Sequence, residues 1–263
     1  MKIGKCKYCR LKKPLAESHL IPRAIFEMHG VDGEVVMVTS RMVGFTGRQR
    51  KYPLLCVECE RSLSGDGEDW TIPLLADRQG GFPLYDLLTR VPPDCADSDV
   101  AGYAVVRNPD INVQKLTHFA LGIFWKASVH SWRGGEVEDL IELGPYSDEI
   151  RMFLRGEGPF PKHVALAVGV LPKPVRQLSF SEPYHGTSGA FRNFFFYLPG
   201  IIFSLSVGNR IGDVKESCFY SNALHPIIVS DIADDIQGVM EKVAKNARFS
   251  KRLIDEVRSR GLR

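Results

Sequence analysis

Two pairs of cysteines are the residues of this 263-residue chain whose type and spacing most clearly could do chemistry. Cys6 and Cys9 form one CxxC pair, and Cys56 and Cys59 form a second pair after 46 intervening residues. Each pair suits a tight turn that aims two thiolates at one point, and two such turns make a tetrahedral zinc site. The spacing predicts one structural zinc ion held by all four cysteines, which leaves no open position for catalysis.

The other two cysteines, Cys95 and Cys218, have no partner at ligand spacing, so we expect ordinary surface or core residues there. Two alternatives exist for the CxxC pairs, namely unliganded buried thiols and a thiol redox switch. No thioredoxin-like βαβ pattern accompanies the pairs, which argues against the redox switch.

The composition is that of an ordinary globular protein, because 44% of the residues are hydrophobic and 25% are charged. These values exclude disordered, collagen-like and disulfide-scaffold chains. The first residues are too polar for an export signal, and no apolar run approaches the roughly 20 residues of a membrane-spanning helix. We therefore expect a cytoplasmic protein without a membrane partner, in which reduced thiols favour metal binding over disulfides.

Positive charge gathers at the two ends of the chain, although the net charge is only +3. Residues 1–61 contain 12 Lys and Arg against 6 Asp and Glu, and residues 241–263 contain 8 against 3. Basic ends around an acidic centre suit a polyanion bound near the termini. For the C-terminal segment, a solvated helix face explains the charge equally well.

Short strands and helices must position the cysteines, and the sequence patterns for them predict a small N-terminal module over residues 1–80. Alternating apolar residues indicate short strands over 33–43 and 50–56. A short helix over 21–28 has a proline in its first turn, and a second helix is expected from Cys59 onward.

Residues 81–263 predict a larger α+β domain with an antiparallel sheet, so the whole chain belongs to the α+β class. Residues 113–127 are apolar on most of a helical surface, which indicates a core helix. Four β-branched or aromatic stretches between residues 163 and 229 indicate the sheet. A helix is then expected over 231–247, and no motif assigns this domain a role beyond sensing, dimerisation or partner binding.

Three pieces of the N-terminal segment, "CKYC", "ESHLIP" and "LLCVECE", together resemble an HNH endonuclease of the ββα-metal fold in its four-cysteine, zinc-stapled variant. The resemblance covers about residues 5–70. It implies that His19 is the general base, because a neutral imidazole can take a proton from an attacking water at cellular pH. The implied activity is metal-dependent hydrolysis of phosphodiester bonds, with defence against foreign DNA as one role.

The same resemblance implies a catalytic divalent cation, Mg²⁺ or Mn²⁺, beside His19. In the family, an acidic residue directly before the histidine helps to hold it, and here that position is Ser18. Glu17, one residue earlier, and Glu60, at the family's helix position, are the expected carboxylate ligands. Glu68 follows eight residues after Glu60, but "SGDGE" between them makes a continuous helix there doubtful.

Basic residues around the two cysteine pairs are expected to bind nucleic acid, as double-stranded DNA, through its phosphates. They are Lys5, Lys7, Arg10, Lys12, Lys13, Arg48, Arg50 and Lys51. The alternative function is a catalytically degenerate, zinc-stapled module that binds nucleic acid or a protein partner without cutting. A homodimer or a partner protein would then use the C-terminal domain.

Overall fold

The structure is a computed structural model, and it describes residues 2–29, 35–38, 42–46, 49–75, 81–132, 141–172, 181–186, 191–230, 248–252 and 254–255. The strands are β1 Lys2–Lys5, β2 Lys12–His19, β3 Val35–Val38, β4 Met42–Thr46, β5 Lys51–Cys56, β6 Cys95–Ala96, β7 Val100–Ala104, β8 Val164–Val170, β9 Tyr184–His185, β10 Arg192–Leu198, β11 Ile201–Val207, β12 Pro226–Ser230 and β13 Arg248–Phe249. The α-helices are α1 Arg23–His29, α2 Val57–Leu63, α3 Asp69–Leu75, α4 Pro83–Leu88, α5 Val113–Val129 and α6 Tyr146–Leu154, with short turns η1 Ser64–Glu68, η2 Val105–Arg107 and η5 Asp213–Ser217.

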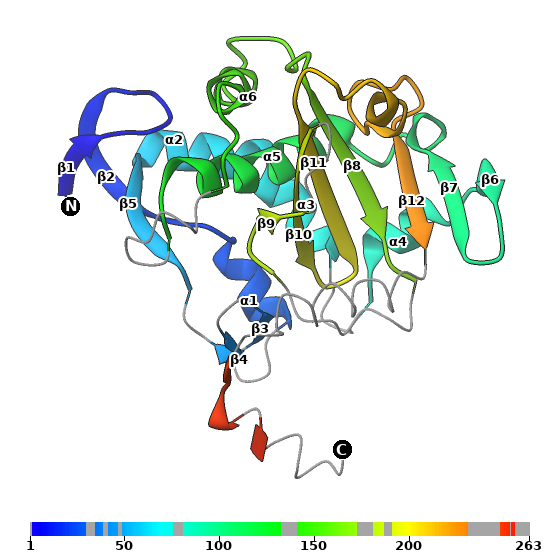
Figure 1. Ribbon diagram of the computed structural model, residues 1–263, viewed down its shortest axis with the longest axis horizontal. Helices are drawn as coiled ribbons and strands as arrows, with labels where there is room; N and C mark the ends of the chain where they lie inside the picture. The colour runs from blue at the N-terminus through cyan, green and yellow to red at the C-terminus, as the bar shows by residue number, and fades with distance from the viewer. Residues whose placement is uncertain are drawn as a thin grey trace.

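The largest sheet of the described residues has the strand order β6-β7-β12-β8-β11-β10-β9 (Figure 1). Its neighbouring strands run antiparallel except for the parallel pair β12 and β8. β8, β10, β11 and β12 are the four strands that the sequence predicts. The antiparallel sheet and the α+β class are therefore confirmed.

The core helix predicted over 113–127 is α5, and it lies against a face of the large sheet. Its Phe119 ring is 5.9 Å from that of Phe203, and its Phe124 ring is 4.9 Å from that of Phe196, measured between centroids. The Asn112 side chain caps the helix by accepting a hydrogen bond from the backbone of Lys115. Figure 1 shows α5 between the large sheet and the N-terminal strands.

A second sheet, of order β1-β2-β5, carries the cysteines. β1 and β2 form an antiparallel hairpin whose turn contains the first cysteine pair, and β2 also pairs antiparallel with β5. α2 begins directly after β5, two residues before the helix start expected at Cys59. The register between β2 and β5 shifts between Ala16 and Glu17. Such a bulge re-aims the side chains that follow it.

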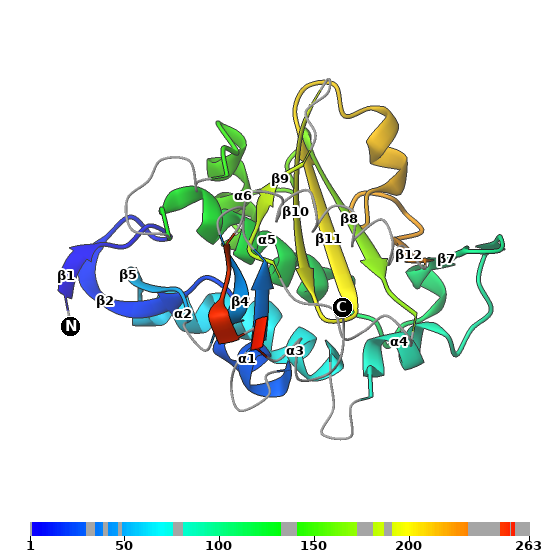
Figure 2. The same cartoon turned by 60° about the horizontal axis from the view of Figure 1, so that its bottom comes forward.

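The third sheet, of order β13-β4-β3, takes two of its strands, β3 and β4, from the segment between the two cysteine pairs. β3 and β4 form an antiparallel hairpin, and β13 near the C-terminus pairs parallel with β4. Figure 2 shows the red C-terminal strand beside β4. The helix predicted over 231–247 lies outside the described residues.

Buried apolar residues form one continuous core that extends over both predicted parts of the chain. Tyr8 of the cysteine turn, for example, meets Trp125 of α5 edge to face, with ring centroids 5.3 Å apart. Phe194 and Phe196 are fully buried, as expected for an aromatic run inside a sheet. A division of the chain at residue 80 stays a prediction, and α5 supplies core contacts to both sides of it.

Candidate functional site

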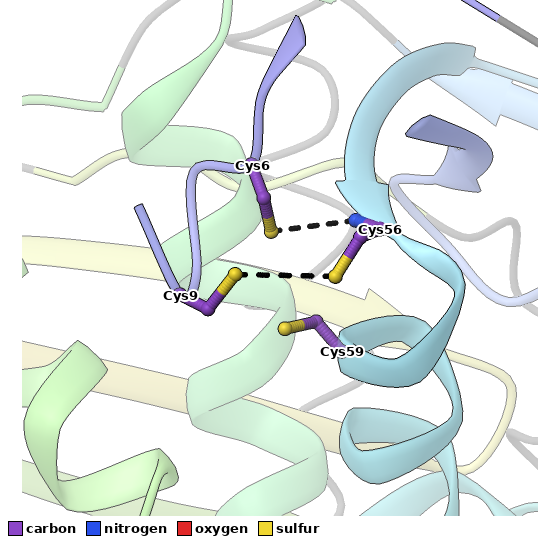
Figure 3. A group of neighbouring side chains, drawn as sticks. All are labelled: Cys6, Cys9, Cys56 and Cys59. Atoms are coloured by element: carbon purple, nitrogen blue, oxygen red, sulfur yellow. Dashed lines mark hydrogen bonds between the residues drawn. The ribbon is translucent and has the colours of Figure 1, made fainter. Parts of the chain in front are cut away.

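The four cysteines of the two CxxC pairs come together at one point. Cys6 and Cys9 lie in the β1–β2 turn, whereas Cys56 and Cys59 lie at the end of β5 and in the first turn of α2. Figure 3 shows the four sulfurs turned toward one another. All four Sγ atoms lie within 4.8 Å of one another. In the described part of the chain, this is the only group of three or more side chains that could hold a metal ion.

The spacing of the sulfurs fits a tetrahedral ion such as zinc. A zinc–sulfur bond of about 2.3 Å places the sulfurs of a tetrahedral site roughly 3.8 Å apart. The Sγ atoms of Cys9 and Cys56 are 3.9 Å apart. Cys95 is exposed and Cys218 is buried away from this group, as the sequence predicts for ordinary residues.

Local backbone geometry turns the first pair toward the second. The N–H of Arg10 donates to the carbonyl of Cys6 at 2.9 Å, and Arg10 itself has a φ of 64°. This left-handed conformation is unusual for a residue other than glycine, so the surrounding turn must hold it. The N–H of Cys56 donates to the sulfur of Cys6 at 3.3 Å, which joins the two pairs directly.

The thiol pKa values show what an ion would do for this cluster. Burial opposes ionisation of Cys6, but backbone N–H groups, led by that of Cys9, outweigh it and lower the pKa. Burial raises the pKa of Cys59. A bound dication would favour the thiolate at both residues, because thiolates are the ligands of such an ion.

A polar cluster adjoins the cysteines where β2 meets α2. Ser18 is fully buried, and its hydroxyl donates to a carboxylate oxygen of Glu60 at 2.6 Å. The N–H of Leu55 donates to the same hydroxyl at 3.2 Å, which fixes its position. Burial raises the pKa of Glu60, although the charge of Lys126 and the Ser18 hydrogen bond act against this.

Lys126 of α5 brings a positive charge into this cluster. Its side chain is 2% exposed, and its Nζ lies 3.2 Å from an Oε1 atom of Glu68, whose side chain is 18% exposed. Glu68 approaches because the helical path continues beyond α2: residues 64–68 form a π-helical turn that leads into α3. The α-helix is not continuous through "SGDGE", but the π turn keeps the path helical there.

His19 ends β2 and is half-buried. Burial lowers its pKa, and the positive charges of Lys126 and Lys51 lower it further, while Glu17 opposes the shift. This direction favours the neutral form of the imidazole at pH 7. Glu17 is exposed and forms an ion pair with Lys51 at 2.8 Å, whereas the adjacent Ser18 points inward to Glu60.

The predicted catalytic cation does not fit these residues as they lie. Glu17 pairs with a lysine at the surface, Glu60 pairs with a buried hydroxyl, and neither joins His19 in a group of three metal-binding side chains among the described residues. The ammonium of Lys126 already supplies a positive charge to the half-buried carboxylates of Glu60 and Glu68. A dication at the same place would be repelled by it.

The pH dependence of stability should report the environment of His19. Because its folded pKa is lowered, the unfolded chain binds the proton more readily, and this contribution to stability is lost as pH falls from about 6.5 through the folded pKa. We expect the free energy of unfolding of wild type to fall over this window relative to His19→Gln. Urea unfolding at pH 5, 6 and 7 measures it, and a parallel pH profile for the two proteins would contradict it.

The predicted nucleic-acid-binding residues divide into paired and unpaired groups. Lys13 lies 3.6 Å from Glu58, Arg50 lies 2.7 Å from Glu182, and Arg10 pairs with Asp148. With Lys51, four of the basic residues therefore have acidic partners. The exposed residues whose side chains form no hydrogen bond or ion pair with another described residue are Lys5, Lys7 and Lys12. Arg48 lies outside the described residues.

The residue that the sequence analysis missed is Lys126. It lies within the apolar core helix. A lysine is almost never fully buried in a protein unless it is paired with an acidic group. That single charge in an apolar segment was the available signal, but its partner, Glu68, is 58 positions away.

No helix in the described ranges is long and apolar enough to cross a membrane. Comparison of the chain with protein-family models, with curated proteins and with solved structures gives no match.

Proposed function

We propose that this protein binds nucleic acid through an HNH-like ββα module that zinc holds together and that does not cut its ligand. The likeness to the ββα-metal fold is supported by the antiparallel pair β2 and β5, which α2 follows directly. It is further supported by the cysteine group, which joins the β1–β2 turn to that helix. Ser18 and Glu60, at the two positions that the resemblance assigns to a cation, touch each other.

The observation that carries the proposal is the network in which buried Ser18 and Lys126 contact the half-buried Glu60 and Glu68. Ser18 replaces an anionic ligand with a neutral hydroxyl, and that hydroxyl is taken up by Glu60. Lys126 contributes a fixed ammonium where hydrolysis would call for a divalent cation. A module with this interior keeps its shape without a second metal ion, which favours binding over hydrolysis.

Exposed lysines on the β1–β2 hairpin support nucleic acid as the ligand. Lys5, Lys7 and Lys12 have no acidic partner among the described residues, so their charge is available to phosphates. Lysine contacts to phosphate give salt-sensitive affinity without base readout. The proposed ligand is therefore a nucleic-acid backbone, with double-stranded DNA as the first case.

A metal-dependent endonuclease is the second candidate, and the state of His19 favours it. A half-exposed neutral imidazole near a lysine can accept a proton from a water that attacks a phosphodiester bond. This candidate requires that the cluster of Glu60 and Glu68 rearrange around the reacting phosphate.

One experiment separates the two candidates. Purified protein is incubated with supercoiled plasmid in Mg²⁺ or Mn²⁺ and, in parallel, its binding to a fluorescent DNA duplex is followed by anisotropy as the salt concentration rises. We expect binding that weakens with salt, at a slope of about −0.9 per phosphate contacted, and no cleavage.

The control variant is His19→Ala. Cleavage by wild type that is lost in His19→Ala would overturn the binding-only proposal in favour of the endonuclease. Equal cleavage by both proteins would point to a contaminating nuclease and leave neither candidate with support from activity. Absence of both binding and cleavage would overturn both candidates.

A further inference from the structure

A cavity of about 530 Å³ lies between the cysteine turn, α5 and the start of α6. Its size is within the roughly 300–1,000 Å³ of small-molecule sites, which often occur where two parts of a protein meet. Here the β1–β2 turn of the N-terminal module faces two helices of the remaining chain. The lining residues on which the argument depends are Lys5, Lys7, Arg10, Trp125, Asp148 and Arg151.

The lining carries more positive than negative charge. Lys5, Lys7, Arg10 and Arg151 face the single carboxylate of Asp148. Both arginines pair with that carboxylate, which neutralises it. The side chains of the two lysines form no hydrogen bond or ion pair with any other residue in the described ranges. No carboxylate of the cavity lining therefore pairs with them, and the negative group beside them is the sulfur of Cys6.

Arg151 gives the cavity a rigid cationic wall. Its side chain is 9% exposed, its Nε donates to Asp148 at 2.8 Å and its Nη1 donates to the carbonyl of Tyr8 at 2.9 Å. These bonds fix the plane of the guanidinium before any ligand arrives. A planar guanidinium with remaining N–H groups matches the geometry of a phosphate.

An apolar surface lies beside these charges. Trp125, Val129 and Pro145 line the cavity together with the cationic residues. A ligand with one anionic group and one flat or apolar part would contact both kinds of surface. A nucleotide has this composition, because its phosphate is joined to a sugar and a base.

We propose that this cavity binds the phosphate of a nucleotide unit, with Lys5 and Lys7 neutralising its charge and Arg151 fixing its orientation. The inference rests on the proposed function, since it assigns one phosphate subsite to the nucleic acid that the module binds. The same chemistry would accept a free mononucleotide, so the experiment uses both sources of phosphate.

The test compares Lys5→Gln/Lys7→Gln with Lys2→Gln/Lys162→Gln. Both variants remove two exposed lysines, but only the first pair lines the cavity, and neither control lysine is among the residues expected to bind nucleic acid. Affinity for a DNA duplex is measured by anisotropy, and affinity for dAMP by isothermal titration calorimetry. We expect Lys5→Gln/Lys7→Gln to lose about tenfold or more in affinity for the DNA duplex, for dAMP or for both, and the control variant to lose less. For the DNA duplex, the slope of log affinity against log salt concentration should become shallower by about 1.8 in Lys5→Gln/Lys7→Gln, because two phosphate contacts are lost.

Zinc content and circular dichroism confirm that each variant folds. Should the double variant fail to fold, Ser147→Asp adds a negative charge to the same cavity and should weaken binding to a similar extent. Equal effects of cavity and control variants on DNA binding would overturn the phosphate subsite and leave nucleic-acid binding in place. Binding of dAMP that depends on Lys5 and Lys7, without DNA binding, would support the subsite and overturn the proposed function. If neither DNA nor dAMP binds, both the phosphate subsite and the proposed function are overturned.

Discussion

Loss of the metal ion that the four cysteines are arranged to hold is expected to unfold the N-terminal part of the protein. Structural zinc contributes roughly 10–16 kcal/mol of apparent binding free energy in small domains, which matches or exceeds the roughly 5–15 kcal/mol of a typical domain's stability. The cysteines tie the β1–β2 turn to α2, and both belong to the continuous core. We expect Cys59→Ser, or treatment with a strong chelator, to abolish the cooperative thermal transition of wild type or lower it by tens of degrees.

The matched control for this result is Cys95→Ser. Cys95 is an exposed thiol outside the cysteine group, so its replacement should leave both the zinc content and the transition temperature unchanged. Elemental analysis of protein purified without chelator measures the metal directly. A zinc content near zero per protein, with an unchanged thermal transition after chelation, would show that the four thiols stabilise the fold without an ion.

Replacement of Lys126 by methionine is expected to destabilise the protein by about 3–5 kcal/mol, because it leaves two half-buried carboxylates without their positively charged partner. The Lys126 side chain is 2% exposed, and its ammonium pairs with Glu68 and acts on the neighbouring Glu60. Methionine keeps most of the volume and removes only the charge. Urea unfolding at pH 7 measures the change in the free energy of unfolding.

Two further variants isolate the electrostatic origin of that loss. Lys115→Met removes another lysine of α5, whose Nζ donates to the carbonyl of Gly65 at 3.2 Å, and it should cost only about 1 kcal/mol. Glu68→Gln, added to Lys126→Met, should restore part of the lost stability because it removes the unpaired charge. The ion pair would contribute no more than an ordinary hydrogen bond if Lys126→Met and Lys115→Met lowered the free energy of unfolding equally and Glu68→Gln restored none of it.

Local sequence patterns could predict the elements of this fold because their signals lie within a few residues. The CxxC spacing identified all four cysteines of the group, and the apolar surface of residues 113–127 identified α5. Short stretches of β-branched or aromatic residues identified β8, β10, β11 and β12. Each of these signals reflects the geometry of a turn, a helix or a strand by itself.

The interior of the candidate site could not be predicted in the same way, because its contacts join distant parts of the chain. Glu60 was expected beside a cation with Glu17, but a buried hydroxyl accounts for Glu60 and a surface lysine accounts for Glu17. The positive charge beside the half-buried carboxylates of Glu60 and Glu68 comes from α5, which only the tertiary fold brings near. Pairings of the basic residues, such as Arg50 with Glu182, are equally invisible to local patterns.

The parallel pairing of β13 with β4 has a consequence for synthesis of the chain. Arg248 of β13 pairs with Met42 of β4, so the partner strand leaves the ribosome long after the β3–β4 hairpin. At about 5–20 residues per second, the roughly 200 intervening residues take about 10–40 s to translate. During that interval β4 has an open edge, and any nascent segment that could pair with it competes with β13.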